Sequence, residues 1–186
     1  MKIAIVGDIN VGKSSLVSRW LYRNREPNCE HTVGVDVTTT TIHFYDKAHQ
    51  LKIFDLCGNS GYDKLYDTYL LNATCCVVVY DVTKIKTWVR AKKLVEKIIG
   101  IHTDNYPIIL VGNKIDDIVH RRIPSSKALG YVKAKYNTYF IEVSAKNGSN
   151  TTQCLKIVAT EAARKHIVVS IDPVEDKYRN SSCCIV

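Results

Sequence analysis

No apolar run in this sequence approaches the ~20 residues that a membrane-spanning helix requires. The apolar stretch after Met1 and Lys2 is only four residues long, which is too short for a secretory leader. We therefore expect a chain that is made and kept in the cytosol. The sequence also lacks C-x-x-C pairs and cysteine–histidine clusters with zinc-ligand spacing. Its cysteines number seven, and an odd count in a cytosolic protein argues against a disulfide framework.

Acidic side chains are in the minority, with 18 Asp and Glu against 26 Lys and Arg and a formal net charge of +8. Such a balance favours acidic partners, either anionic lipid or nucleic acid. The basic residues do not alternate with aromatics as they would in a nucleic-acid groove, so we do not expect nucleic acid as a partner. We interpret them mainly as solvated faces of helices: Lys92, Lys93, Lys97, Arg121, Arg122, Lys133 and Lys135.

Internal repeats and low-complexity stretches are also missing, and strand-like and helix-like segments alternate instead. This alternation predicts an α/β fold with a mostly parallel six-stranded sheet and helices on both faces. The length of 186 residues suits one domain, which we place at residues 1–169, followed by a polar flexible tail at 170–186. The expected strands are Lys2 to Val6, Val35 to Tyr45, Leu51 to Leu56, Cys75 to Tyr80, Ile108 to Val111 and Tyr139 to Val143.

A phosphate-binding loop follows the first expected strand. Gly7-Asp8-Ile9-Asn10-Val11-Gly12-Lys13-Ser14 reads G-x-x-x-x-G-K-S and opens a helix. The glycines let the backbone turn and present N–H groups to a polyphosphate. Lys13 supplies a cation for the phosphates and Ser14 an oxygen for Mg²⁺, while the helix directs its positive end at the anion.

Two further segments end strands at the edge of the sheet where ligands of such folds bind. Asp55 is a candidate for holding Mg²⁺ through water, or else a turn or cap residue, and Gly58 has an N–H for a γ-phosphate. Asn113-Lys114-Ile115-Asp116 reads N-K-x-D. A carboxylate there accepts from N1–H and the 2-amino group of guanine, a donor pair that adenine lacks.

Two weaker signals complete the candidate site. Ser144-Ala145-Lys146 follows the last expected strand and offers a backbone N–H to guanine O6, although alone it would be an ordinary loop. Thr32 is able to complete Mg²⁺ coordination when a γ-phosphate is present, or it simply enters the next strand.

Together these motifs resemble a small GTPase of the Ras superfamily over Met1 to about Val169, with the P-loop GTPase fold. Several segments resemble the Rab branch in particular: Thr32-Val33-Gly34-Val35-Asp36, Tyr66-Asp67-Thr68-Tyr69 and Cys76-Val77-Val78-Val79-Tyr80-Asp81-Val82-Thr83. The resemblance implies Mg²⁺ ligation by Ser14 and Thr32. It also implies nucleotide-sensing switches at Arg25 to Val37 and Gly58 to Leu70, which would meet effectors, exchange factors and activating proteins.

Three positions depart from the family pattern. The family usually has W-D-T-A-G-Q-E where this chain has Phe54-Asp55-Leu56-Cys57-Gly58-Asn59-Ser60, so Asn59 stands in place of the catalytic glutamine. Arg25 replaces the aromatic residue that stacks on guanine, and a guanidinium plane is also able to stack on a base. Val37 replaces a usual phenylalanine, which puts ordinary partner recognition in doubt.

The chain ends in Ser182-Cys183-Cys184-Ile185-Val186. The paired cysteines resemble Rab prenylation tails, which implies prenylation machinery as a partner and a membrane anchor. The same string fits C-a-a-X with Cys183 as the single acceptor. Two lipid chains anchor a protein stably, whereas one binds membrane only marginally.

The sequence therefore predicts a Rab-like switch that binds GTP and GDP with Mg²⁺, hydrolyses GTP slowly and acts at membranes in vesicle traffic. One alternative is a hydrolysis-deficient module that stays GTP-bound and recruits effectors; a nucleic-acid-binding GTPase is more distant. The expected catalytic residues are Lys13, Thr32, Gly58 and Asn59, and the expected metal site is Ser14, Thr32 and Asp55. The expected nucleotide site is Gly7, Asp8, Ile9, Asn10, Val11, Gly12, Lys13, Ser14, Ser15, Arg25, Thr32, Gly58, Asn113, Lys114, Asp116, Ser144, Ala145 and Lys146.

Overall fold

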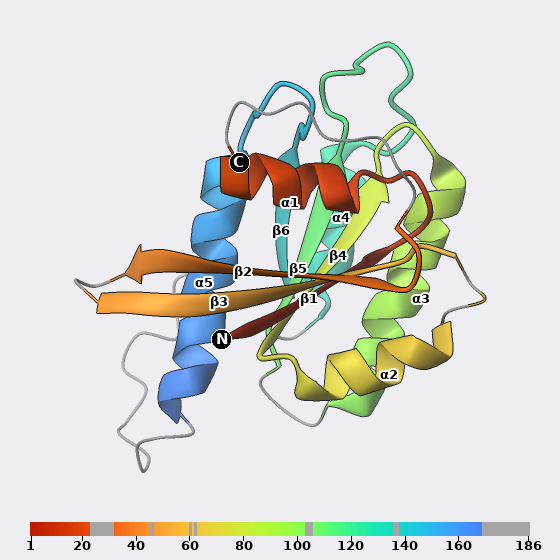
Figure 1. Ribbon diagram of the computed structural model, residues 1–186. Helices are drawn as coiled ribbons and strands as arrows, with labels where there is room; N and C mark the ends of the chain where they lie inside the picture. Colours follow the sequence, from red (N-terminus) through yellow and green to blue (C-terminus); the bar gives the residue numbers. More distant parts are fainter. Residues whose placement is uncertain are drawn as a thin grey trace.

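The computed structural model describes residues 1–22, 32–44, 47–59, 61, 63–102, 106–135 and 138–168, and within these ranges it has six strands. They form one sheet in the order β2-β3-β1-β4-β5-β6, in which only the β2–β3 pair is antiparallel (Figure 1). The strands are β1 (Lys2–Gly7), β2 (Val35–Phe44), β3 (Lys47–Leu56), β4 (Cys75–Asp81), β5 (Ile108–Asn113) and β6 (Thr138–Val143).

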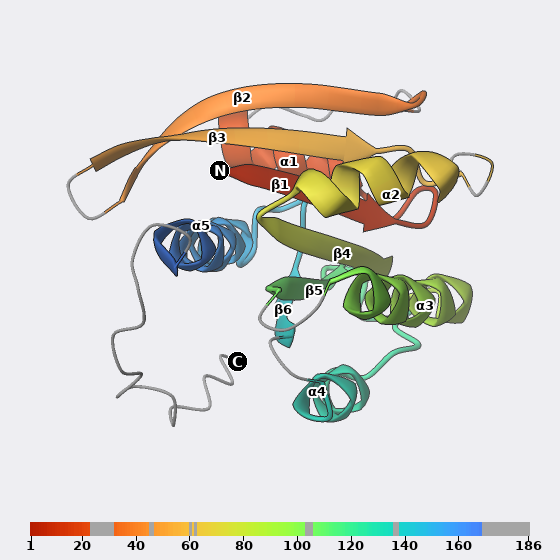
Figure 2. The same cartoon turned by 90° about the horizontal axis from the view of Figure 1, so that it is seen from below.

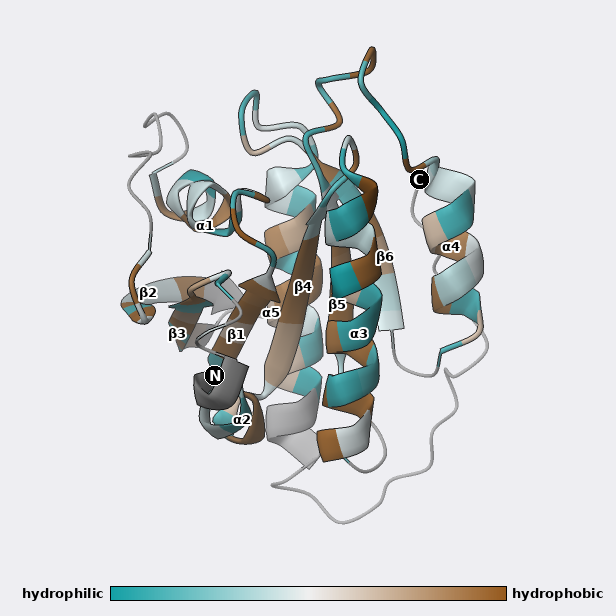
Figure 3. Cartoon of the chain, turned by 90° about the vertical axis from the view of Figure 1, so that its right-hand side faces the viewer, coloured by the Kyte–Doolittle hydropathy of each residue, from teal (hydrophilic) through white to brown (hydrophobic). Residues whose placement is uncertain are grey.

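Five helices in the described ranges pack on the two faces of this sheet (Figure 2). One apolar core lies beneath α1 and α5 and the other beneath α2, α3 and α4. The central strands β4 and β5 are buried at every position, which explains their continuous apolar sequences (Figure 3). The helices are α1 (Lys13–Tyr22), α2 (Asp63–Asn72), α3 (Ile85–Ile101), α4 (Ser125–Lys133) and α5 (Thr151–Val168).

The predicted fold class is confirmed, and the main difference lies in the β2–β3 hairpin. We expected the second hairpin strand to begin at Leu51, but β3 begins at Lys47 and pairs with β2 along its whole length. Cross-strand hydrogen bonds to the Thr-rich β2 override the weak strand propensity of residues 47–50. The sequence also predicts a helix over Ser125 to Lys135, and the observed helix ends two residues earlier, at Lys133.

The parallel strands bring their carboxyl ends to one edge of the sheet. The loop after β1, the end of β3, the loop after β5 and the loop after β6 all lie along this edge. These are the segments that carry the sequence motifs, so the topology gathers them into one site.

Candidate functional site

The loop between β1 and α1 has a backbone that only glycine accommodates at its end. Gly12 has a φ of +92°, and a Cβ there would lie 2.4 Å from Nδ2 of Asn113. Asn10 also has a positive φ of 59°, a conformation that asparagine tolerates better than most residues. The Leu16 N–H donates to the Gly12 carbonyl at 2.9 Å and closes the first turn of α1. The loop therefore wraps around the start of the helix, as anion-binding loops do.

Lys13 is held inside this loop. Its side chain is buried, and Nζ donates to the carbonyl of Asp8 at 2.9 Å and to that of Gly7 at 3.3 Å. Burial lowers the pKa of Lys13, and the carboxylate of Asp55 partly offsets that shift. The result is a cation fixed at the centre of the loop.

Gly58 approaches the same loop from the end of β3. A Cβ at position 58 would lie 2.5 Å from the carbonyl atoms of Asp8 and from the backbone nitrogen of Ile9. Any side chain would have to push the two loops apart, so glycine is required for this close approach. The expected γ-phosphate donor therefore lies directly against the phosphate loop.

Three oxygen-bearing side chains meet beside Lys13. The hydroxyls of Ser14 and Thr32 are 2.9 Å apart. Asp55 is 3% exposed, and its Oδ1 has no hydrogen-bond partner within the described ranges. Burial raises the pKa of Asp55, while a hydrogen bond from Ser14 and the charge of Lys13 lower it less strongly. Two hydroxyls and a buried carboxylate with one unpaired oxygen are hard oxygen donors of the kind that Mg²⁺ prefers, so these residues fit that ion.

Asn113 connects three of the predicted segments. Its Nδ2 donates to the Val11 carbonyl at 2.8 Å, and its Oδ1 accepts from the backbone N–H of Ala145 at 3.0 Å. The side chain is buried, so these are well-protected hydrogen bonds. The amide thus ties the phosphate loop to the loops after β5 and β6.

Lys114 makes a second connection across the site. It has a positive φ of 71°, and its Nζ donates to the Asn10 carbonyl at 2.8 Å. The same ammonium lies 2.7 Å from Oδ2 of the buried Asp81, at the end of β4. Burial raises the pKa of Asp81, but hydrogen bonds from Lys114 and Thr83 outweigh it and hold that pKa below its usual range. Lys114 therefore links the phosphate loop to the buried carboxylate of Asp81.

Asp116 faces the loop after β6. Ser144 Oγ donates to Asp116 Oδ1 at 2.6 Å, and Lys146 Nζ lies 3.9 Å from Oδ2. Arg19 of α1 donates to the carbonyls of Ala145 and Lys146. One carboxylate is thus held in a fixed orientation at the far end of the site from Lys13.

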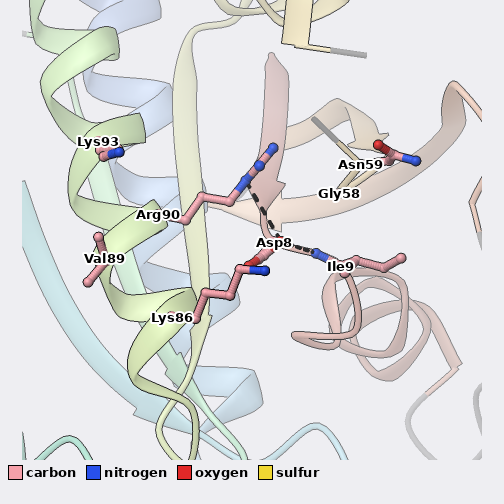
Figure 4. Close-up of a pocket in the computed structure, with 8 residues that line it drawn as sticks. All are labelled: Asp8, Ile9, Gly58, Asn59, Lys86, Val89, Arg90 and Lys93. Carbon is pink, nitrogen blue, oxygen red and sulfur yellow. Dashed lines mark hydrogen bonds and ion pairs between the residues drawn. The ribbon is translucent and has the colours of Figure 1, made fainter. Parts of the chain in front are cut away.

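Asn59 sits at the outer rim. Its side chain is exposed, and its Oδ1 accepts a hydrogen bond from the Gly61 N–H at 3.0 Å within its own loop. Next to it, a pocket of about 650 Å³ lies between this loop, the phosphate loop and α3 (Figure 4).

A sequence model of the Ras family matches residues 2–164. The chain belongs to the Ras family. It is 30% identical to the Ras-related protein RABG3f of Arabidopsis thaliana over 88% of this chain and 82% of that protein. It is 31% identical to a Ras-related protein Rab7 of Pisum sativum over 88% and 82%, and 32% identical to a Ras-related protein Rab-7a of Paramecium octaurelia over 87% and 81%.

These relatives make the chain a Rab-type small GTPase, a GTP-binding protein with GTPase activity. The family binds GTP and GDP, typically with Mg²⁺. In the part of the chain that the structure describes, no group of three or more His, Cys, Asp or Glu is placed to hold a metal. The candidate Mg²⁺ site in this Rab-type GTPase instead combines one carboxylate with two hydroxyls.

Three predicted site residues lie outside the described residues: Arg25, Cys183 and Cys184. The same holds for residues 25–31 of the first switch and for residues 60 and 62 of the second. Within the described ranges, no helix of this Rab-type GTPase is long and apolar enough to cross a bilayer. Of the seven basic residues interpreted as solvated faces of helices, none is buried, and Lys92, Lys93, Lys97 and Lys133 lie on helices. The structure corrects the placement of Arg121, Arg122 and Lys135, which lie in the loops on either side of α4.

Sequence reasoning missed three residues that contact the loops of the site: Asp81, Arg19 and Arg90, whose Nε lies 3.9 Å from Oδ1 of Asp8. Asp81 ends a buried strand at the same edge as the motifs, and that position was the available signal. Arg19 and Arg90 act from helices, where a basic residue has no distinctive sequence context. Cys75 and Cys76 are fully buried at the start of β4.

Proposed function

We propose that this chain is a Rab-like molecular switch that hydrolyses GTP slowly and acts at membranes in vesicle traffic. The observation that supports it best is the linkage through Asn113, which joins the phosphate loop to the loops that would read the base. A nucleotide spanning both ends would be held by loops that are already fixed relative to one another. Such preorganisation favours tight and selective binding.

At the phosphate end, Lys13 and the backbone of residues 7–15 would surround the β- and γ-phosphates. Ser14, Thr32 and Asp55 would hold Mg²⁺, which neutralises phosphate charge when bound. Gly58 would donate its N–H to the γ-phosphate, because its backbone already touches the phosphate loop. Loss of that phosphate would release Thr32 and Gly58 and change the surfaces at residues 25–37 and 58–70.

At the base end, Asp116 would accept two hydrogen bonds from guanine. To accept both hydrogen bonds, the Asp116 carboxylate must be held in a fixed orientation, and the short hydrogen bond from Ser144 supports this. Ala145 and Lys146 would complete the pocket, and Arg25 would stack on the base. We keep residues 1–169 as the nucleotide-binding domain and 170–186 as the tail.

Membrane attachment would come from lipid on Cys183 and Cys184. Intact-mass analysis of protein from eukaryotic cells should show two isoprenoids. One isoprenoid on Cys183, with the three residues after it removed, would support the C-a-a-X alternative. An unmodified terminus would remove the membrane part of the proposal.

A second candidate is a hydrolysis-deficient module that stays GTP-bound and recruits effectors. It is favoured by Asn59, whose amide oxygen is engaged by Gly61 and is therefore turned to its own loop. Single-turnover hydrolysis of loaded GTP separates the two candidates, because the module would release no phosphate over hours.

The experiment that tests the switch itself is nucleotide content. The purified full chain, denatured and analysed by chromatography, should release close to one guanine nucleotide per protein. Finding no guanine nucleotide, or adenine nucleotide instead, would contradict the proposed function.

A further inference from the structure

The pocket beside the phosphate loop carries an excess of positive charge. Its cationic wall is one face of α3, where Lys86, Arg90 and Lys93 follow one another at helical spacing. Figure 4 shows Lys86 and Arg90 extending from α3 toward the phosphate loop, with Lys93 further along the helix. Asp8 is the sole acid among the eight lining residues, which leaves the pocket at +2.

That acid is already engaged. Asp8 Oδ1 accepts from the Ile9 N–H at 2.9 Å, and it lies 3.9 Å from Nε of Arg90. Its side chain is only 11% exposed, so it is committed to the loop and to Arg90. The charges of Lys86 and Lys93 are therefore not neutralised by Asp8.

Other lysines of α3 have partners. Lys97 pairs with Asp67 at 2.7 Å, and the Lys92 ammonium lies 5.7 Å from the centre of the Trp88 ring. For Lys86 and Lys93, the described ranges offer no acidic side chain within ion-pair distance. Two like charges beside a concave surface favour a ligand that brings negative charge.

The pocket also has apolar contact area. Ile9 is 49% exposed and Val89 is 43% exposed, and both line it. An apolar side chain placed between acidic ones would fit this combination better than a bare ion. In Figure 1, α5 lies on the opposite side of the sheet from α3, the helix that forms the cationic wall of this pocket. That placement favours a protein partner over the lipid surface.

From these observations we propose that the pocket docks an acidic segment of a partner protein, with Lys86 and Lys93 binding its carboxylates and Ile9 and Val89 contacting an apolar side chain. Gly58 and Asn59 form another wall, so docking depends on the bound nucleotide, a step that rests on the proposed function. By linkage, a partner that prefers one nucleotide state stabilises that state in return. The basic face of α3 is thus a recognition surface rather than merely a solvated one.

The test uses the ¹⁵N-labelled full chain with Mg²⁺, loaded with GDP or with a non-hydrolysable GTP analogue. The probe is a blocked peptide of four glutamates around one leucine. Its binding is detected from changes in the amide chemical shifts of the labelled protein. We expect shifts at the pocket and affinities that differ between the two nucleotides. Shifts scattered over the other basic helices would overturn the proposal.

Matched variants separate a specific site from general attraction. Lys86→Gln with Lys93→Gln should weaken peptide binding about fivefold or more, whereas Lys127→Gln with Lys133→Gln on α4 removes the same charge and should change it less than about twofold. Equal losses in the two double variants would overturn the proposal. The proposal would also be overturned if the peptide did not bind and anionic vesicles did, with a larger loss in the Lys86→Gln, Lys93→Gln variant than in the α4 variant. Both variants should keep their guanine nucleotide, so a failure of the pocket is distinguishable from a failure of the proposed function.

Discussion

Asn113 donates from its side-chain amide to the Val11 carbonyl at 2.8 Å, so the end of β5 holds the phosphate loop directly. The same side chain accepts from the backbone N–H groups of Ala145 and Lys114. With an exposed fraction of 2%, it has little water available to replace these partners.

Asn113→Ala should therefore destabilise the nucleotide-free protein by about 2–4 kcal/mol, because a buried carbonyl and a buried N–H lose their partners. Urea unfolding without nucleotide measures this free energy, and GDP dissociation from loaded protein should become faster. Asn72→Ala is the control, since that exposed side chain makes one bond to the Thr68 carbonyl and should cost less than about 0.5 kcal/mol. Equal effects of the two variants would contradict the tethering role of Asn113.

Asp116→Asn should change base selectivity. The asparagine amide has a donor in place of one carboxylate acceptor, which no longer matches the donor pair of guanine. GDP affinity should therefore fall about a hundredfold or more, and the affinity for xanthine nucleotides should rise. Fluorescent GDP and XDP titrations measure both affinities. The neighbouring Asp117→Asn is a matched control, because Asp117 bonds to the exposed His120. Unchanged GDP affinity in Asp116→Asn, or comparable wild-type affinity for ATP, would rule out the base-reading role.

Asp55→Asn should stabilise the nucleotide-free protein, but it should weaken the retention of GDP when Mg²⁺ is bound. Burial raises the pKa of Asp55 in the folded state, so the protonated carboxyl is the form that favours folding. This contribution is present below the ordinary carboxyl pKa and is lost as pH rises through the raised value. At pH 7 the neutral amide should therefore make the nucleotide-free protein more stable, by about 1 kcal/mol. Urea unfolding should show the gain shrinking as pH falls toward 4.

With GDP and Mg²⁺ present, Asp55→Asn should remove the contribution of Mg²⁺ to GDP retention. EDTA should accelerate GDP release from the wild type by about tenfold or more and have little further effect on Asp55→Asn, because the carboxylate is the charged Mg²⁺ donor. Asp36→Asn serves as the control, since Asp36 lies opposite Asp55 in the β2–β3 ladder and is exposed. It should keep the EDTA response. A wild type that is insensitive to EDTA would remove the metal assignment.

The strands and most helices were predictable because the chain obeys simple rules along its length. Short continuous apolar runs such as β4 are typical of buried parallel strands, and parallel strands gather motifs at one edge. The ion pair between Lys114 and Asp81 was not predictable, because its partners are distant in sequence and meet only through the order of β4 and β5. Likewise, the pocket at Arg90 depends on how α3 is rotated against β1, a packing property that no local pattern contains.

Asn59 carries the remaining prediction. A glutamine at this position orients the attacking water beside the γ-phosphate. Asparagine is one methylene shorter, and here its Oδ1 accepts from the Gly61 N–H at 3.0 Å, which is an Asx turn. To position water, the amide would have to break that hydrogen bond and still span a longer gap. Misplacing a positioning group by ~1 Å can reduce a rate about a hundredfold.

Intrinsic hydrolysis should therefore lie at or below roughly 10⁻⁴ s⁻¹, the slow end for this family. Asn59→Gln should raise it several-fold, because the longer side chain does not favour the local turn and reaches further. GTP affinity should not change, since the side chain is exposed and lies at the rim. Asn59→Ala separates the effect of the local hydrogen bond from the effect of side-chain length. It removes the hydrogen bond to Gly61 without lengthening the side chain, so its hydrolysis rate should not rise. Single-turnover phosphate release from loaded protein measures all three. A wild type that already hydrolyses at the family rate, with a glutamine variant no faster, would show that asparagine is a competent substitute and would leave the GTP-bound recruiting module without its main support.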